Sequence, residues 1–465
     1  MAVAQEELNR QFDLMTEDKK LLADRLGGRT PKAYTHTYGC QGNVSDGEKI
    51  DGILAQIGYE FTEDPAEADF ILFNTCAVRE HAEERVFGNL GRLKKYKAEN
   101  PNLIIAVCGC MAQEEHVAKR LKSNFKYVDL VFGTHVQYKL PEFIYTILTE
   151  ETRVFDITDD HNDIAEGVQL KRTNNLKGFL QISYGCNNFC TYCVVPYVRG
   201  RERSRAYDEI MREAHEMVEA GYKEIMLLGQ NVNSFGKDLG QPNLFPKLLR
   251  EINDIPGDFI IRFMTSHPKD CSKELLDTMA ACEKVERHIH LPFQSGNDRV
   301  LKAMHRHYDR AHYLEIVNYA KQVMPDICIT SDVIVGFPGE THEEFLDTVS
   351  LVQEVEFTSL YTFIYSPRVG TPAASMEDPY TREEKQMWFE QLQYAQEQVA
   401  SRRSAATKDQ TFRVLVEGHS KNGKLNGRTS GNVMIEFEGP EELIGSFQKV
   451  KVTEPLTWIL KGELV

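Results

Sequence analysis

Three closely spaced cysteines, Cys186, Cys190 and Cys193, constrain this chain more than any other feature of its sequence. Thiolates are the ligands that iron–sulfur clusters prefer, and three of them in a C-x3-C-x2-C spacing can hold three irons of a cubane cluster. No fourth cysteine lies nearby in the sequence. One iron would therefore stay open, so the spacing predicts a reactive cluster rather than a closed electron-transfer centre.

Two other uses of these cysteines, a zinc knot and a disulfide framework, fit the sequence less well. Structural zinc needs four ligands, and no second pair of ligands follows at the distance typical of zinc ribbons. The chain has only 10 cysteines in 465 residues, too few for a disulfide scaffold. Its first residues are polar and acidic, so we expect no secretory leader.

Length and charge limit what kind of protein this is. A chain of 465 residues should form several domains, because single cores stop growing at about 250–300 residues. No apolar run approaches the roughly 20 residues needed to span a bilayer, so we expect a cytoplasmic protein without a membrane partner. The net charge of −16 argues against a broad polyanion-binding surface, so any nucleic-acid contact must be local.

The first half of the chain is typical of an α/β fold. Residues 1–30 read as an N-terminal helical arm that ends at a cluster of glycines and Pro31. In residues 31–150 short apolar strands alternate with helices, which predicts an open parallel α/β sheet. Residues 151–172 are acidic around positions 159–163 and weakly patterned, and they read as a linker.

Cys40, Cys76 and Cys110 each follow a predicted strand of this sheet. Loops after the carboxyl ends of parallel strands gather along one edge, which is where ligands bind. Two of the three cysteines also follow a glycine, which permits a tight turn. The pattern predicts a second metal cluster, and the alternative is three unrelated buried thiols.

Six further strand-like segments alternate with helices in residues 173–401, which predicts a partial (β/α)6 barrel followed by a connecting helix. The loop that carries the first three cysteines follows the first of these strands. Several later strands end in Gly, Gln, Ser or charged residues that suit a polar cofactor, although any single one is also typical of an ordinary turn. The candidates are Gly229, Gln230, Ser266, Gln294, Ser295, Arg306 and Asp332.

Short strands separated by glycine-rich turns predict a small antiparallel β-barrel over residues 402–465. Lys424 and Arg428 lie in one hairpin of this barrel, and Arg201 and Arg203 follow the cysteine loop. We take these four as candidate RNA contacts, with solvated or ion-paired side chains as the alternative.

Taken together, these segments resemble the methylthiotransferase family of radical S-adenosylmethionine (SAM) enzymes from about residue 32 to 465. Three motifs resemble most the subgroup that acts on N6-isopentenyladenosine next to the anticodon in tRNA. They begin at Tyr38-Gly39-Cys40-Gln41, Leu227-Leu228-Gly229-Gln230 and Tyr365-Ser366-Pro367-Arg368. The family combines a methylthiotransferase domain, a radical SAM barrel and a C-terminal TRAM domain that binds the substrate macromolecule.

The resemblance implies two 4Fe-4S clusters and SAM as cofactors. Cys40, Cys76 and Cys110 would bind an auxiliary cluster, and the C-x3-C-x2-C set would bind the radical-generating one, with Tyr192 beside the cofactor. The other cysteines, Cys108, Cys271, Cys282 and Cys328, are expected in the core. Implied partners are a tRNA anticodon stem-loop, a reducing electron-donor protein and proteins that supply sulfur and assemble clusters.

The implied reaction is methylthiolation at carbon 2 of adenine, an unactivated C–H that acid–base groups alone cannot attack. Two alternatives within the family are action on N6-threonylcarbamoyladenosine in tRNA and action on an aspartate of a ribosomal protein. An alternative from another class is a non-catalytic iron–sulfur regulatory protein, which the polar strand ends argue against.

Overall fold

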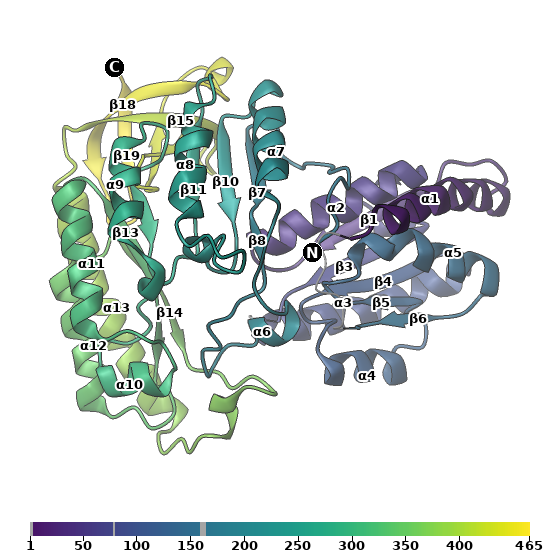
Figure 1. Cartoon of the computed structure of the whole chain (residues 1–465), viewed down its shortest axis with the longest axis horizontal. Coiled ribbons are helices and arrows are strands. Elements are labelled where there is room, and N and C mark those ends of the chain that lie inside the picture. The colour runs from purple at the N-terminus through teal and green to yellow at the C-terminus, as the bar shows by residue number, and fades with distance from the viewer. Residues whose placement is uncertain (1–2, 78–79, 159–163) are drawn as a thin grey trace. The chain divides into compact units, whose positions relative to one another are not determined.

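The computed structural model describes residues 3–77, 80–158 and 164–465, and it divides into two compact units (Figure 1). The first unit comprises Met1–Thr173, Tyr184–Asn187 and Val194–Arg205, and the second contains the rest of the chain. The predicted acidic stretch 159–163 lies outside the described residues. Among those residues, no helix has the length and apolar character needed to cross a membrane.

The first unit is built on a six-stranded sheet in the order β2-β1-β3-β4-β5-β6, and every neighbouring pair of strands is parallel. This confirms the predicted open parallel sheet. The two short edge strands were not predicted, and β6 lies in the stretch that we read as a linker. The strands are β1 (Lys32–Thr37), β2 (Glu60–Phe61), β3 (Phe70–Thr75), β4 (Ile104–Gly109), β5 (Leu130–Phe132) and β6 (Val154–Asp156).

Helices cover both faces of this sheet and form two apolar cores. One core joins the sheet to α1, α2 and α5, and the other joins it to α3 and α4. Neighbouring residues of β3 serve opposite cores, since Phe70 belongs to the first and Ile71 to the second. The helices are α1 (Gln5–Arg25), α2 (Gln41–Ile57), α3 (Glu80–Glu99), α4 (Glu115–Asn124) and α5 (Leu140–Glu150).

The N-terminal arm is helical, as predicted, and α1 packs onto the first core through one buried stripe. Leu8, Gln11, Met15, Asp18 and Leu22 form this stripe at helical spacing. Asp18 is 0% exposed, and its carboxyl group makes no hydrogen bond to any residue that the structure describes. Burial raises the pKa of Asp18 to about 8, and the charge of Glu17 raises it further. A titratable group therefore lies inside a mostly apolar contact.

We predict that Asp18→Asn removes a pH dependence from the docking of α1. A carboxyl group whose pKa is raised on folding disfavours the folded state once it ionises, so docking is strongest below the unfolded pKa. The parent should lose up to roughly 4 kcal/mol of docking free energy between pH 5 and pH 8. Hydrogen exchange of the α1 amides would show this loss, and the variant should lack it. Exposed Asp13→Asn on the same helix is the control, and parallel pH profiles for parent and D18N would contradict the prediction.

The second unit contains six parallel barrel strands arranged in two three-stranded sheets, β11-β10-β7 and β12-β13-β14. A single parallel bridge between Ile261 and Val285 links the end of one sheet to the start of the other. This arrangement confirms the predicted partial (β/α)6 barrel. The strands are β7 (Lys177–Gln181), β10 (Glu224–Leu228), β11 (Ile260–Phe263), β12 (His288–His290), β13 (Cys328–Val335) and β14 (Ser359–Ile364).

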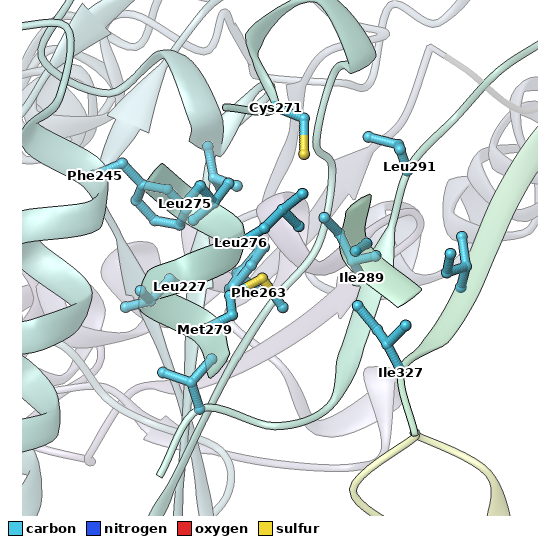
Figure 2. Close-up of a cluster of buried hydrophobic side chains, with 14 of the residues drawn as sticks. Leu227, Phe245, Phe263, Cys271, Leu275, Leu276, Met279, Ile289, Leu291 and Ile327 are labelled. Atoms are coloured by element: carbon cyan, nitrogen blue, oxygen red, sulfur yellow. The ribbon is translucent and has the colours of Figure 1, made fainter. Parts of the chain in front are cut away.

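Helices follow these strands and bury one continuous core (Figure 2). The long helix α13 begins with the predicted capping box between Thr381 and Glu384. The helices are α7 (Tyr207–Glu219), α8 (Leu244–Asp254), α9 (Lys273–Ala281), α10 (Asp298–Ala303), α11 (Arg310–Val323), α12 (His342–Val355) and α13 (Arg382–Ala405). Short elements β8 (Ser183–Tyr184), α6 (Val195–Val198) and β9 (Arg203–Ser204) lie in the segment whose parts are divided between the units.

The cysteines expected in the core are mostly buried. Cys271 packs against apolar side chains in Figure 2, and burial raises the pKa of its thiol to about 12. Cys282 lies in the same core and Cys108 in the first unit's core. Cys328 is the exception, because it is only partly buried and faces Gly431 of the C-terminal barrel.

The C-terminal residues form a closed five-stranded barrel in the order β15-β16-β17-β19-β18. The prediction of an antiparallel barrel needs one correction, because β17 and β19 pair in parallel while the other four ladders are antiparallel. Residues 425–428 form a strand that we read only as part of a hairpin. The strands are β15 (Thr411–His419), β16 (Leu425–Arg428), β17 (Met434–Phe437), β18 (Phe447–Pro455) and β19 (Ile459–Leu464).

Candidate iron–sulfur and cofactor sites

In the first unit, Cys40, Cys76 and Cys110 follow three adjacent strands, β1, β3 and β4. Cys40 is the residue that precedes α2 at its N-terminus. Gly39 and Gly109 have φ values of +145° and +93°, and a Cβ at Gly39 would lie 2.8 Å from the Cβ of Cys76. The turns therefore need glycine, and they bring the three cysteines to one edge of the sheet as the spacing predicted.

Asn43, on the first turn of α2, connects these three positions. The Sγ of Cys40 donates to its Oδ1 at 3.3 Å. Its Nδ2 donates to the carbonyl oxygen of Thr75 at 3.1 Å and lies 3.9 Å from the Sγ of Cys110. Asn43 belongs to one of the motifs quoted above, but its role depends on contacts with distant residues that the sequence does not predict.

Arg199 places a buried positive charge among the same sulfurs. Its Nε donates to Cys110 Sγ at 3.1 Å, and its Nη2 donates to Asp46 Oδ2 at 2.8 Å. Burial raises the pKa of the Cys110 thiol to about 11, and the charge of Arg199 opposes that rise. Such a cation compensates the negative charge that three cluster thiolates bring.

Three thiols are the donor type that iron–sulfur clusters prefer, so the chemistry of this set fits a cluster. Within residues 3–77, 80–158 and 164–465, no group of three or more His, Cys, Asp or Glu side chains is close enough to hold one ion. In a cubane cluster each thiolate binds a different iron, so the sulfurs need not converge on one point. A Cβ at Gly42 would lie 3.6 Å from Cys40 Sγ, an ordinary van der Waals distance, so this position lies next to the sulfur without requiring glycine.

The second unit holds Cys190 and Cys193 in a loop that follows β7. The N–H of Cys193 donates to the carbonyl oxygen of Cys190 at 2.9 Å, which makes a tight turn. Thr191, between them, donates its N–H to Met304 at 3.1 Å and its hydroxyl to Ala303 at 2.9 Å. These bonds fix the loop to the end of α10. The third member of the motif, Cys186, is buried and belongs to the first unit, where its N–H donates to Gly200.

Arg306 is the buried cation of this second site. It donates from Nη1 to Cys190 Sγ at 3.3 Å and from Nη2 to the carbonyl oxygen of Pro292 at 2.7 Å. Its Nη1 also lies 3.5 Å from the hydroxyl of Tyr192, whose ring packs with Met304 and Phe337. Arg306 thus contacts the cysteine loop, which contains Tyr192.

The ends of the barrel strands present polar atoms that lack partners inside the described chain. These atoms are Oγ of Ser266 and Oε1 of Gln294, and both side chains are buried. Gln294 has a φ of +67°, a conformation that is strained for a residue other than glycine. Gly229 lies close to Ser183: a Cβ at this position would lie only 2.6 Å from Ser183 Oγ. Gly229 thus allows the close packing of Ser183, while the two buried unpaired atoms of Ser266 and Gln294 fit a polar ligand such as SAM.

For the remaining predicted cofactor contacts, Ser295, Asp332 and Gln230, the structure gives local contacts or burial only. Ser295 serves the turn before α10, since its hydroxyl accepts from Asn297 N at 3.3 Å. Asp332 is partly buried and lies 3.5 Å from His290 Nε2. Gln230 is partly buried after β10.

Most of the arginines proposed for RNA have partners within the protein. Arg203 donates to the carbonyl oxygen of Arg199 at 3.2 Å, and Arg428 donates to that of Asn432 at 3.2 Å. Arg428 precedes a turn whose Thr429 and Ser430 carbonyls accept from Arg262 of β11, so this turn packs on the (β/α)6 barrel. Lys424 pairs with exposed Glu438 at 3.0 Å, and Arg201 is exposed.

Three family models match this chain in succession. Residues 32–133 match "Uncharacterized protein family UPF0004", residues 180–352 match the radical SAM superfamily and residues 406–465 match the TRAM domain. A solved structure of the radical SAM methyltransferase TsrM from Kitasatospora setae shares the fold with a TM-score of 0.55 and 12% identity. That match covers 74% of this chain and 77% of TsrM. The fold and the matched models define a radical SAM enzyme.

Relatives identify the family within that class. Proteins from Thermoanaerobacter sp. and Thermoanaerobacter pseudethanolicus are each 49% identical over all of this chain and 98% of their own length. A protein from Acetivibrio thermocellus is 46% identical over all of this chain and 97% of its own length. All three are named tRNA-2-methylthio-N(6)-dimethylallyladenosine synthase, and this chain belongs to that family.

We predict that Arg306→Gln uncouples SAM cleavage from cluster content. The substitution removes the charge-assisted bond to Cys190 Sγ but leaves the cysteines in place. Reductive SAM cleavage should fall by about tenfold or more, a barrier increase of at least about 1.4 kcal/mol, with iron content unchanged. Arg299→Gln, which removes an exposed ion pair to Glu344, is the matched control. Equal cleavage by R306Q and parent would contradict a role beside the cofactor.

Proposed function

We propose that this chain methylthiolates carbon 2 of N6-isopentenyladenosine next to the anticodon of tRNA, using two 4Fe-4S clusters and SAM. The observation that carries the proposal is the pair of three-cysteine sets, one at the edge of the first unit's sheet and one in the loop after the first barrel strand. Full-length relatives that carry the synthase name support the same substrate.

Cys40, Cys76 and Cys110 would hold the auxiliary cluster. Asn43 would orient these thiolates through its bonds to the loops after β1 and β3. Arg199 would compensate their charge, and its own position is fixed by the buried ion pair to Asp46. Hydrogen bonds to cluster sulfurs tune the reduction potential, so these two residues would also set the electronic properties of the site.

Cys186, Cys190 and Cys193 would hold the second cluster, with an open iron for SAM. When bound, this cluster and SAM supply the one-electron chemistry that an unactivated C–H requires. The protein's own residues would orient the bound groups and shield them from water. Arg306 donates to the Cys190 sulfur, and the partly buried ring of Tyr192 packs against the cluster of Met304 and Phe337. Ser266 and Gln294 offer unpaired polar atoms.

The macromolecular partner in this proposal is a tRNA anticodon stem-loop. The net charge of −16 restricts RNA contacts to local features, so exposed Arg201 is the better candidate among the four basic residues. Lys424 is partly buried and would exchange its ion pair with Glu438 for a phosphate. Arg203 and Arg428 donate to carbonyls within the protein and would act mainly by shaping their loops. An electron-donor protein and cluster-assembly proteins would complete the cytoplasmic system.

To test this function, the cluster-reconstituted protein would be incubated with SAM and each of two substrates under anaerobic, reducing conditions. Matched anticodon stem-loops would carry either isopentenyladenosine or threonylcarbamoyladenosine, and nucleoside mass spectrometry would detect the methylthio product. We expect product only from the isopentenyl substrate and none from a variant with Cys186, Cys190 and Cys193 changed to alanine.

Other outcomes would reject this substrate. Product only from the threonylcarbamoyl stem-loop would move the chain to that reaction, and SAM cleavage without either product would point to a protein substrate. Absence of SAM cleavage by a protein with full iron content would favour a non-catalytic regulatory role.

A further inference from the structure

The second unit contains a cavity of about 350 Å³ that the function above does not use. It lies where α8 and α9 begin, beside the first turns of α11. This volume is at the lower end of the range of small-ligand pockets, so the cavity suits one small ligand unit rather than several linked units. The residues that matter for its chemistry are Asn233, Lys237, Lys269, Asp270, Lys273 and Glu315.

One wall of the cavity is apolar. Phe245, Leu275 and Leu276 contribute to it and belong to the barrel's main core, with Cys271 beside them in Figure 2. Phe245 is fully buried at the first turn of α8. A flat, mostly apolar ring could pack against this wall and remain shielded from water.

Asn233 supplies the polar group inside the cavity. Its side chain is only 4% exposed, and neither Oδ1 nor Nδ2 has a hydrogen-bond partner in the described part of the chain. Leaving both a donor and an acceptor unpaired is costly, so a ligand that pairs with both would be favoured. A side-chain amide presents these groups side by side, as needed to bind the edge of a nucleobase, above all adenine.

Cations and two helix N-termini lie around the same cavity. Lys237, Lys269 and Lys273 line it, together with Asn243 and Ser272, which precede α8 and α9. The carboxylates are already engaged. Asp270 accepts from Asn231 at 2.6 Å and pairs with Lys237, and Glu315 pairs with Lys273 at 3.0 Å. The excess of lysines and the helix N-termini suit a phosphate.

We propose that this cavity binds one nucleotide, with the base against the apolar wall and Asn233 and the phosphate at the lysines. Lys269 also donates to Asn188, which lies in the loop that carries Cys190, so the cavity adjoins the reactive loop. The nucleotide is a residue of the RNA, a choice that rests on the proposed function, or a free nucleotide of the same chemistry. Either source uses the same contacts.

The test measures binding rather than turnover. Titration of the cluster-loaded full chain with AMP, followed by calorimetry, should give saturable binding that Asn233→Leu weakens roughly tenfold or more. Lys273→Glu should also weaken it, because the phosphate loses a cation and meets an anion. Exposed Asn318→Leu on α11 is the matched control. Unchanged iron content and unfolding temperature would show that each variant is folded.

Competition separates the two sources. Displacement of AMP by the anticodon stem-loop identifies RNA as the occupant, and binding of AMP that the stem-loop does not displace identifies a free nucleotide. Displacement of AMP by SAM would overturn the proposal, because the cavity would then be the cofactor site. So would absence of AMP binding together with equal stem-loop affinity for parent and N233L. A failed methylthiolation assay leaves these binding results intact, so the two proposals can fail separately.

Discussion

Parallel pairing of strands is the constraint on which both candidate sites depend. When neighbouring strands run in the same direction, the loops after their carboxyl ends lie along one edge. In the first unit β1, β3 and β4 are adjacent, so cysteines far apart in the sequence come to the same edge. In the second unit the same rule places the cysteine loop, Ser266 and Gln294 at the ends of barrel strands.

Each unit also places one buried arginine against a cysteine sulfur. Arg199 donates to Cys110 at 3.1 Å in the first unit, and Arg306 donates to Cys190 at 3.3 Å in the second. Both guanidinium groups have further anchors, the carboxylate of Asp46 and the carbonyl of Pro292. A thiolate-bound cluster brings negative charge into a buried site, and a fixed cation lowers the cost of that burial. The same electrostatic arrangement thus occurs twice in one chain.

The sequence predicts those parts of this structure that follow from local pattern. The cysteine spacing, the alternation of strands and helices, and the capping box at Thr381 all depend on neighbouring residues. Contacts between distant residues could not be predicted. The roles of Asn43 and Arg199, and the packing of the turn after Arg428 on Arg262, are set by chain segments far away in sequence. The unpaired amide of Asn233 is likewise visible only in the packed structure.

Errors in the predicted elements have similar causes. Residues 425–428 contain Asn, Gly and Arg, which disfavour a strand, yet barrel closure pairs them on both sides. The parallel pairing of β17 with β19 likewise follows from closure rather than from the sequence of either strand. Asp18 was read as part of a polar arm, because only the packed structure shows that it lies in the buried stripe of α1.

The central claim is that two separate three-cysteine sets each hold a cluster, and iron analysis tests it most directly. Two triple-alanine variants are needed, one at Cys40, Cys76 and Cys110 and one at Cys186, Cys190 and Cys193, with Cys108→Ala as control. The parent and control should bind about eight irons per chain, and each triple variant about four with a cubane spectrum. Loss of all iron from either triple variant, or full iron in either, would contradict two independent clusters.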